Sequence, residues 1–162
     1  KNAELYNLMM ALGIEQDVSN LRYSKIVIAT DADNDGFHIR NLMLTFFLGY
    51  FEELITSGKV FILETPLFRV RNKKETRYCY SEQERDKAIA EIGSSAEVTR
   101  FKGLGEISSN EMGRFIGEDI KLVPVEVSQL NAVPKLLEFY MGKNTPQRRE
   151  FIVNNLLEEV DA

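Results

Sequence analysis

The pattern of apolar and polar residues predicts alternating helices and strands in the first part of the chain. Apolar residues recur at helical spacing over residues 3–12 and are followed by Gly13, a typical helix end. Residues 25–30, KIVIAT, form a continuous apolar run, as expected for a buried parallel strand. Over residues 37–57 the apolar positions surround most of a helical wheel, which predicts a long and largely buried helix. A strand at 60–63 then completes a β-α-β unit.

The rest of the pattern predicts a hairpin followed by short helices and strands. LFRVR and RYCYS flank the polar segment NKKE, which is typical of a β-hairpin. The further expected elements are a helix capped by Ser81 and Glu84 and ending at 92, a strand at 97–101, a helix from Ser108 or Ser109 to about 116, a strand at 122–127, and helices at 131–141 and 145–159. The fold class is therefore α/β, a parallel sheet flanked by helices, with a β-hairpin and a helical C-terminal tail.

Composition narrows the class of protein. Hydrophobic residues make up 44% of the 162, which is enough for a substantial core. The formal net charge of −5 argues against a protein that coats nucleic acid through bulk charge, although a local basic face remains compatible with it. The single cysteine, Cys79, cannot form an internal disulfide, which fits a reducing cytoplasm. No apolar run approaches the ~20 residues of a membrane span.

Three carboxylates follow the KIVIAT run on alternate residues, Asp31, Asp33 and Asp35. A calcium-binding EF-hand loop fits poorly, because the twelfth residue from Asp31 is Leu42 rather than Glu and a strand precedes the loop. At the carboxyl end of a parallel strand, alternate residues of an extended segment point the same way and can converge on one metal ion or a pair. Mg²⁺ suits such hard oxygen ligands. The alternative is that the three aspartates are solvated turn residues that cap the following helix.

The residues that follow the acidic cluster could support it. Gly36 lets the backbone turn sharply into the helix. His38 and Arg40 could steady the carboxylates or contact a phosphate, although a lone histidine is more often a structural hydrogen-bonding residue.

Two basic segments could contact nucleic acid. Arg69 and Arg71 alternate on one face of a predicted strand, so both could reach one phosphate backbone. The plain alternative is a hairpin edge protected by charge. In the loop KGLGE, Lys102 supplies a cation for a phosphate, and Gly103 and Gly105 permit close backbone approach and positive φ. This second signal is weak, and an ordinary turn has the same composition.

Several other functions are disfavoured by the motifs. The single His and the single Cys form no nucleophilic triad, and no P-loop is present, so ATP binding is not predicted within this chain. A phosphatase-like α/β hydrolase would need D-x-D-x-[TV], and Asp35 at the fifth position counts against it. A divalent-cation or DNA-docking module without catalysis remains an alternative.

Three segments together, TDADNDGFHIR, ETPLFRVR and RFKGLGE, resemble the metal-binding (Toprim) region and following tail of the B subunit of bacterial type IIA DNA topoisomerases. The resemblance runs over nearly the whole chain and includes PQRREFI near its end. Within the family, the RNKKET hairpin and the absence of a large insertion favour topoisomerase IV over gyrase. The resemblance implies a Toprim-type, Rossmann-like sheet, with residues 1–106 as a partial metal-binding domain carrying a hairpin insertion and 107–162 as a tail of strand and helices.

The resemblance also implies roles for the candidate residues. Asp31 and Asp33 would be catalytic metal ligands with Asp35 as a third ligand, and Arg69, Arg71 and Lys102 would lie near DNA. Mg²⁺, which Mn²⁺ can replace, would assist cleavage and religation of double-stranded DNA by a Tyr of the partner A subunit. The expected complex is an A2B2 heterotetramer of the bacterial cytoplasm, associated with the chromosome, and ATP would bind a separate N-terminal domain.

The sequence departs from the family in one respect that bears on the fold. No E-G-D-S-A type segment, which supplies a metal-binding Glu and an earlier strand, is found. Asn34 and Phe37 also replace residues that are usually smaller. We therefore expect the first strand to be missing, the isolated chain to lack cleavage activity, and the open sheet edge to promote dimerisation or aggregation.

Overall fold

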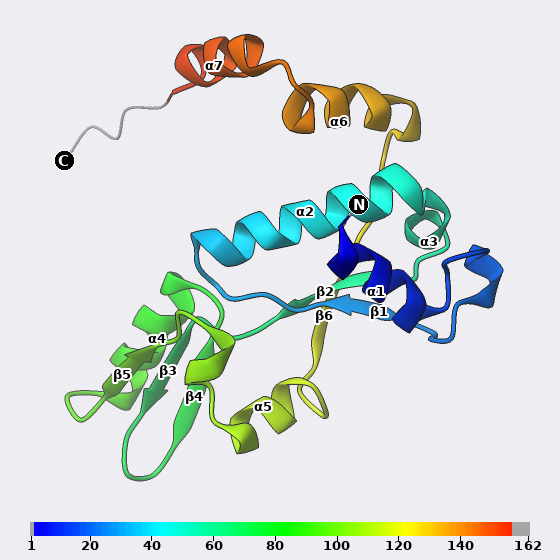
Figure 1. Cartoon of the computed structure of the whole chain (residues 1–162). Helices are drawn as coiled ribbons and strands as arrows, with labels where there is room; N and C mark the ends of the chain where they lie inside the picture. The colour runs from blue at the N-terminus through cyan, green and yellow to red at the C-terminus, as the bar shows by residue number, and fades with distance from the viewer. Residues whose placement is uncertain (1, 157–162) are drawn as a thin grey trace.

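The predicted β-α-β unit forms the centre of the molecule (Figure 1). A computed structural model of the chain describes residues 2–156. β1 (Ile26–Ile28) pairs in parallel with β2 (Val60–Glu64), and α2 (Asn34–Tyr50) and the short α3 (Glu52–Thr56) connect them. β6 (Lys121–Pro124) joins β2 on its other side in antiparallel orientation, which gives the strand order β1-β2-β6. The α/β class is confirmed, and β1 lies at the edge of this sheet.

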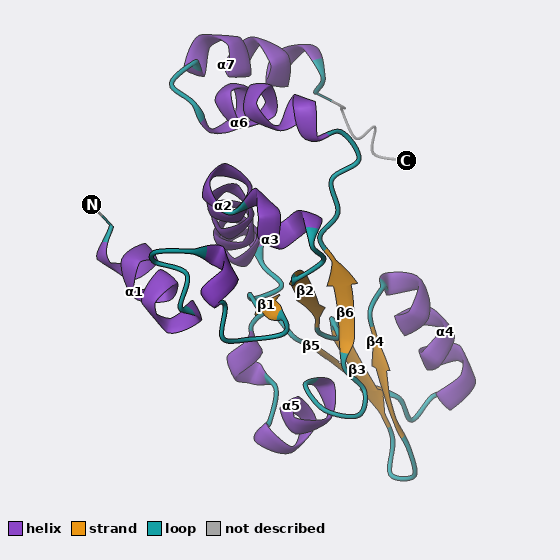
Figure 2. Ribbon diagram, turned by 90° about the vertical axis from the view of Figure 1, so that its right-hand side faces the viewer, coloured by secondary structure: helices purple, strands orange, loops and turns teal. Residues whose placement is uncertain are grey.

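A second sheet is inserted between β2 and β6. It contains β3 (Phe68–Arg71), β4 (Thr76–Cys79) and β5 (Glu97–Arg100), with β3 in the centre and antiparallel to both neighbours. The predicted hairpin is confirmed by the pairing of β3 with β4. α4 (Glu82–Ile92) packs against β3 and β4 (Figure 2), and α5 (Ser109–Phe115) follows the loop after β5.

The last two helices lie on the far side of α2 from the sheets (Figures 1 and 2). α6 (Val133–Met141) packs on α2, where the Leu137 side chain lies 3.8 Å from the position of a Cβ on Gly49. α7 (Thr145–Asn154) returns along α6. The predicted helix was longer, and residues 157–159 of that prediction lie outside the described residues. None of the helices in residues 2–156 combines the length and hydropathy that a membrane span requires.

Helix ends follow the capping rules. α1 (Ala3–Leu12) ends at Gly13, whose φ of +79° is the left-handed conformation that glycine tolerates best. The Ser81 side chain accepts the Glu84 N–H at the start of α4, but the Glu84 carboxylate accepts the N–H of Tyr80 instead of that of Ser81. The predicted cap of α4 is therefore present, with its second hydrogen bond shifted by one residue.

The prediction of a largely buried helix after the acidic turn is wrong. The helix predicted over 37–57 is divided into α2, which begins at Asn34 and ends at Tyr50, and the short α3. Leu54 and Ile55 of α3 are buried, but among the large apolar residues of α2 only Phe46 and Phe47 are. Phe37 and Tyr50 are 57% and 78% exposed. The sheet and α1 cover only part of the helix, so that apolar residues on its remaining face contact solvent. Val27 of β1 is exposed for a similar reason, which also corrects the prediction of a fully buried strand.

Most of the buried apolar residues in the described part of the chain belong to three clusters. The largest lies between α1, α2, α3 and the β1-β2 pair and includes Phe47 and Val60. The second joins the hairpin sheet to α4 through Phe68, Val70, Cys79 and Ala88. The third consists of Phe101, Ile107 and Phe115, which flank the KGLGE loop and α5. The candidate site lies between the end of β1, which contributes to the first cluster, and the loop that joins Phe101 and Ile107 of the third.

Candidate metal-binding site

Asp31 follows the carboxyl end of β1 and binds the KGLGE loop. Oδ1 of its carboxylate accepts the Leu104 N–H over 2.7 Å, and the next residue, Ala32, donates its N–H to the Lys102 carbonyl over 3.2 Å. Two hydrogen bonds therefore join the acidic turn to a loop 73 residues further along the chain. The structure brings together two motifs that the sequence analysis treated separately.

Two glycines make close contacts with Asp31, one from within the turn and one from the loop. A Cβ on Gly36 would lie 2.1 Å from the Asp31 carbonyl oxygen, so no other residue fits at that position without a backbone shift. A Cβ on Gly103 would lie 3.3 Å from the Asp31 carboxylate. Gly103 and Gly105 do not have positive φ, and nothing lies within 4 Å of a Cβ on Gly105. The prediction of positive φ in this loop is therefore wrong, whereas close approach is confirmed for Gly103.

Asp33 and Asp35 belong to the start of α2. Asp33 is the N-cap, and its Oδ1 accepts the Gly36 N–H over 2.8 Å, while Asp35 lies in the first turn. Asp33 has an extended backbone, but the helix begins at Asn34, so Asp35 is helical and the three residues do not form the single extended segment that was expected. Within residues 2–156, no group of three or more His, Cys, Asp or Glu side chains is arranged to hold a metal ion. The capping alternative describes Asp33.

The donor chemistry nevertheless suits a hard cation. Asp31, Asp33 and Asp35 are all exposed, and the hydrogen bonds that Asp31 and Asp33 accept within residues 2–156 use Oδ1. Mg²⁺ is commonly held by only one or two carboxylates, with water and phosphate oxygens completing its shell. Two such carboxylates would be sufficient protein ligands for Mg²⁺, and a group of three is absent among the described residues. Their role as metal ligands remains a prediction.

Arg40 and His38 are placed differently from each other. The Arg40 Nε and Nη2 lie 3.4 and 3.3 Å from the Thr30 Oγ1, and its guanidinium lies 4.9 Å from the centre of the Phe37 ring. Arg40 and Phe37 line a 370 Å³ cavity at the junction of the two sheets, with Thr30 and Ala32 from the turn and Tyr80 from the hairpin side. His38 is exposed on α2. Arg40 therefore steadies the end of β1 and contacts no carboxylate of the cluster.

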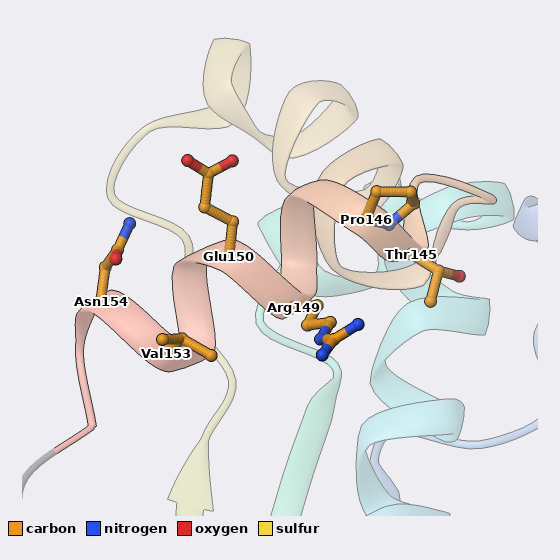
Figure 3. Close-up of a pocket in the computed structure, with 6 residues that line it drawn as sticks. All are labelled: Thr145, Pro146, Arg149, Glu150, Val153 and Asn154. Carbon is orange, nitrogen blue, oxygen red and sulfur yellow. The ribbon is translucent and has the colours of Figure 1, made fainter.

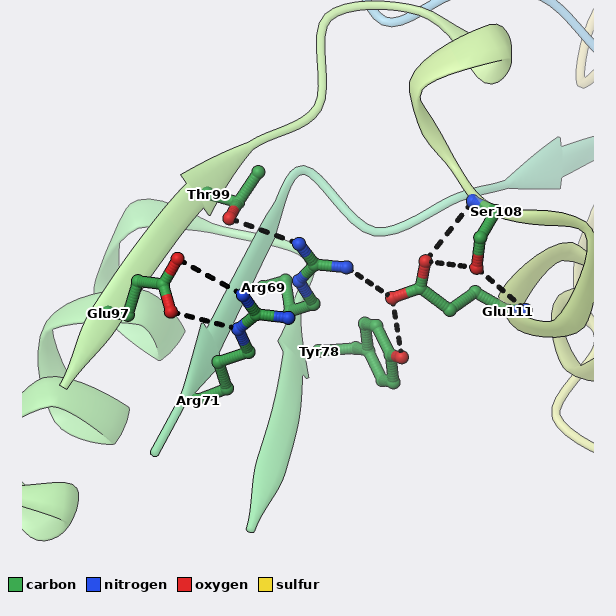
Figure 4. Close-up of polar contacts among 7 residues, drawn as sticks. All are labelled: Arg69, Arg71, Tyr78, Glu97, Thr99, Ser108 and Glu111. Atoms are coloured by element: carbon green, nitrogen blue, oxygen red, sulfur yellow. Dashed lines mark hydrogen bonds and ion pairs between the residues drawn. The ribbon is translucent and has the colours of Figure 1, made fainter. Parts of the chain in front are cut away.

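The two strand arginines are paired with carboxylates (Figure 4). Arg69 Nη1 donates to Glu111 Oε1 over 2.9 Å, and its Nη2 lies 3.4 Å from the Thr99 Oγ1. Arg71 makes a bidentate pair with Glu97 over 3.0 and 3.1 Å. Lys102 is exposed beside Asp31. A DNA contact by any of these three residues remains a prediction, and for the arginines it would compete with existing ion pairs.

Sequence reasoning missed the role of Glu111. Its carboxylate binds Arg69, accepts the Tyr78 hydroxyl over 2.8 Å, and accepts the Ser108 N–H and hydroxyl over 3.1 and 2.6 Å (Figure 4). Burial alone would raise the pKa of Glu111, but the hydrogen bonds from Ser108, Arg69 and Tyr78 outweigh it and lower the pKa to about 2. Burial and the bond to Glu111 raise the pKa of Tyr78 to about 12. The S-x-x-E spacing of Ser108 and Glu111 signalled the helix start, but not the contacts with the hairpin.

A shallow hollow on α7 does not compete with this site (Figure 3). All of its lining residues belong to α7 itself, namely Thr145, Pro146, Arg149, Glu150, Val153 and Asn154. A hollow formed by one helix surface gathers no groups from other elements. The acidic turn and the loop against it therefore remain the candidate functional site.

Comparison with known proteins identifies a domain family and relatives that resemble this chain. Residues 6–65 match the family described as the Toprim domain. The chain is 63% identical over 158 residues to the B subunit of DNA topoisomerase 4 from Borreliella burgdorferi, covering 97% of this chain and 26% of the relative. It is 40% identical over 163 residues to the B subunit of DNA gyrase from Thermus thermophilus, covering 94% of this chain and 26% of that relative. The chain thus spans about a quarter of the length of these relatives.

A solved structure supports the fold. The crystal structure of the Plasmodium falciparum topoisomerase II DNA-binding, cleavage and re-ligation domain matches with a TM-score of 0.79. The match covers 97% of this chain and 23% of that one, at 20% sequence identity. The predicted Toprim-type fold is confirmed, and the sequence is more similar to the topoisomerase IV relative than to the gyrase relative compared with it.

Proposed function

We propose that this chain is part of the B subunit of a type II DNA topoisomerase and supplies the metal-binding carboxylates for DNA cleavage and religation, a proposal supported by its Toprim match and its 63% identity to the Borreliella burgdorferi relative. Asp31 is the central ligand in this proposal, and Asp33 or Asp35 contributes a second carboxylate. Bound Mg²⁺, or Mn²⁺ in its place, neutralises charge that develops at the phosphodiester during cleavage. The observation that carries the proposal is the position of Asp31 at the carboxyl end of β1, held there by the Leu104 N–H.

The chain's own residues prepare this position. The Asp31 carboxylate is oriented by a backbone donor, the Leu104 N–H, whose position is fixed by the fold of the loop. Asp33 caps α2, whose N-terminus carries partial positive charge and favours anions next to it. Lys102, exposed on the adjoining loop, adds a cation toward an incoming phosphate backbone. The site therefore offers negatively charged aspartates for a metal ion and the positively charged Lys102 for a phosphate.

The remaining parts of the reaction would come from other chains and domains. We propose that double-stranded DNA is the substrate and that a Tyr on a partner A subunit is the nucleophile, in an A2B2 complex of the bacterial cytoplasm. ATP would bind a separate N-terminal domain of the full-length protein. Topoisomerase IV is the proposed subtype, supported by the 63% identity to the Borreliella burgdorferi relative against 40% for the Thermus thermophilus gyrase relative.

An Asp31→Asn substitution in the full-length B subunit tests the proposal. The Asn amide oxygen can still accept the Leu104 N–H, but the negative charge that binds a divalent ion is lost. Combined with the A subunit, the variant should relax supercoiled DNA about 100-fold more slowly at the same Mg²⁺ concentration. Unchanged relaxation would contradict the assignment.

Asp17→Asn is the matched control. The Asp17 carboxylate accepts the Ser19 N–H over 2.7 Å in an exposed turn before β1, so the same chemical change is made away from the candidate site. This variant should relax DNA at the rate of the wild-type enzyme. Equal losses in both variants would indicate a general effect of charge removal and would also contradict the proposal.

A further inference from the structure

Glu111 joins three separate parts of the structure. Oε1 accepts hydrogen bonds from Arg69 of β3 and Tyr78 of β4, whereas Oε2 accepts the N–H and hydroxyl of Ser108, the N-cap of α5 (Figure 4). The Ser108 hydroxyl in turn accepts the Glu111 N–H over 3.4 Å, which completes a capping box. One carboxylate therefore fixes the N-terminus of α5 to the hairpin sheet.

This anchor differs from the other ion pairs by its burial. The Glu111 and Arg69 side chains are 12% and 20% exposed, whereas those of the neighbouring Arg71–Glu97 pair are 42% and 63% exposed. Exposed pairs hold their geometry weakly because solvent screens them, while breaking a buried pair leaves an uncompensated charge. Glu111 therefore constrains its surroundings more strongly than Glu97, although both carboxylates bind arginines of the same strand.

The anchor lies at one end of the loop whose other contacts hold Asp31. From Ser108 the chain runs back through Ile107, which is buried in the third cluster, to the 102–106 loop. Within the loop the Glu106 carboxylate accepts the Lys102 N–H over 2.8 Å, and the Glu106 N–H binds the Gly103 carbonyl over 3.1 Å. These bonds close the loop on itself, so that the Leu104 N–H lies in a hydrogen-bonded segment that continues directly to Ser108.

We propose that Glu111 is a positioning residue for the metal site, which acts through the 102–106 loop to fix the Leu104 N–H against the Asp31 carboxylate. This inference rests on the proposed function of Asp31. It gives Arg69 a second role, as the partly buried cation that holds Glu111 in place. Residues that orient a metal ligand without touching the metal commonly change metal affinity by about 10- to 100-fold when removed.

The experiment measures Mn²⁺ binding and hydrogen exchange in the full-length B subunit. Glu111→Ala should weaken Mn²⁺ binding by about tenfold in calorimetric titration. It should also raise deuterium uptake in the peptide that contains residues 102–106, because the loop loses its anchor. Glu97→Gln is the matched control: it breaks the exposed pair with Arg71 on the same sheet and should leave both measurements unchanged.

Glu111→Gln keeps the test decisive where the alanine variant is too unstable to fold. Its single amide oxygen can replace only one of the two carboxylate oxygens, so it keeps the contacts with Ser108 or the one with Tyr78, and the charged pair with Arg69 is lost. We expect a weakening of Mn²⁺ binding that lies between those of the wild-type protein and Glu111→Ala. Unchanged Mn²⁺ affinity and unchanged uptake at 102–106 in the folded Glu111 variants would overturn the proposal.

The Asp31→Asn variant separates this outcome from failure of the proposed function. If Asp31→Asn weakens Mn²⁺ binding and the Glu111 variants do not, Asp31 keeps its assignment and the positioning role alone is refuted. If Asp31→Asn itself leaves Mn²⁺ binding unchanged, the metal site is refuted and the positioning role falls with it.

Discussion

The Leu104 N–H and the Asp31 carboxylate are joined by a 2.7 Å hydrogen bond, although the residues lie 73 positions apart in the sequence. The donor belongs to the backbone, so most substitutions at residue 104 leave it in place. Proline is the exception, because it lacks an N–H. Leu104 is the first residue of a short 3₁₀ helix and follows Gly103 in an extended conformation, both of which proline tolerates.

Leu104→Pro should therefore remove this donor with little other backbone change. In the full-length enzyme we expect the Mg²⁺ concentration for half-maximal relaxation to rise about tenfold. Leu104→Ala keeps the N–H and removes the side chain, and it should shift that concentration much less. Equal shifts in the two variants would indicate that packing of the Leu104 side chain, rather than its N–H, supports the site.

Gly36→Ala should destabilise the chain by about 1–3 kcal/mol, because the added Cβ would lie 2.1 Å from the Asp31 carbonyl oxygen. Urea denaturation measures this change in the free energy of unfolding. Gly113→Ala in α5 is the control, since nothing lies within 4 Å of a Cβ there and alanine favours a helix interior. A Gly36→Ala protein as stable as the wild type would show that the turn can relax away from this contact.

Substitutions of Asp33 should separate its capping role from its proposed metal role. Asp33→Ala removes the acceptor of the Gly36 N–H and should cost about 1 kcal/mol in urea denaturation. Asp33→Asn retains a good N-cap and should cost much less, yet it removes the carboxylate charge. If Asp33 binds metal, both variants should lose Mg²⁺-dependent relaxation. Retained relaxation in Asp33→Asn would leave Asp33 with the capping role alone.

The pKa of about 2 for Glu111 predicts a specific loss of stability in acid. The folded state holds this pKa below its ordinary value of 4.5, so the contribution is fully present above about pH 5 and is lost as pH falls from about 4.5 toward 2. Its full size is on the order of 3 kcal/mol. The difference in free energy of unfolding between wild type and Glu111→Gln should therefore shrink steadily between pH 5 and pH 2. A difference that stays constant over this range would contradict the prediction.

Local sequence signals predicted most elements because each depends on neighbouring residues. The KIVIAT run, the hairpin around NKKE and the cap at Ser108 all follow from periodicity or capping chemistry within a few positions. The exposed face of α2 could not be predicted in this way. An apolar helix surface signals burial only if another element covers it, and periodicity does not tell which faces are covered.

In the candidate site, too, local features could be predicted from the sequence, whereas contacts between distant residues could not. The type and order of its residues could be predicted, and the resemblance pointed to Asp31 and the KGLGE loop. Their contact could not be predicted, and neither could the pairing of Arg69 with Glu111, 42 residues away. The sequence left two interpretations of Asp33 open, because a helix cap and an extended metal-binding turn place the same residue type at the same position.

The pairing of Glu64 with Lys121 in the register of β2 and β6 has a further consequence. Residues 65–120 leave the central sheet after Glu64 and return to it at Lys121, its partner in the β2-β6 pair. They therefore form an inserted segment whose two ends are held together by this pair. Lengthening a loop within such a segment costs little conformational entropy, since doubling the length of a flexible loop raises its closure free energy by only about 0.6 kcal/mol. Outer loops of the inserted segment can therefore lengthen while the β2-β6 pair keeps its geometry, provided that the 102–106 loop retains its hydrogen bond to Asp31.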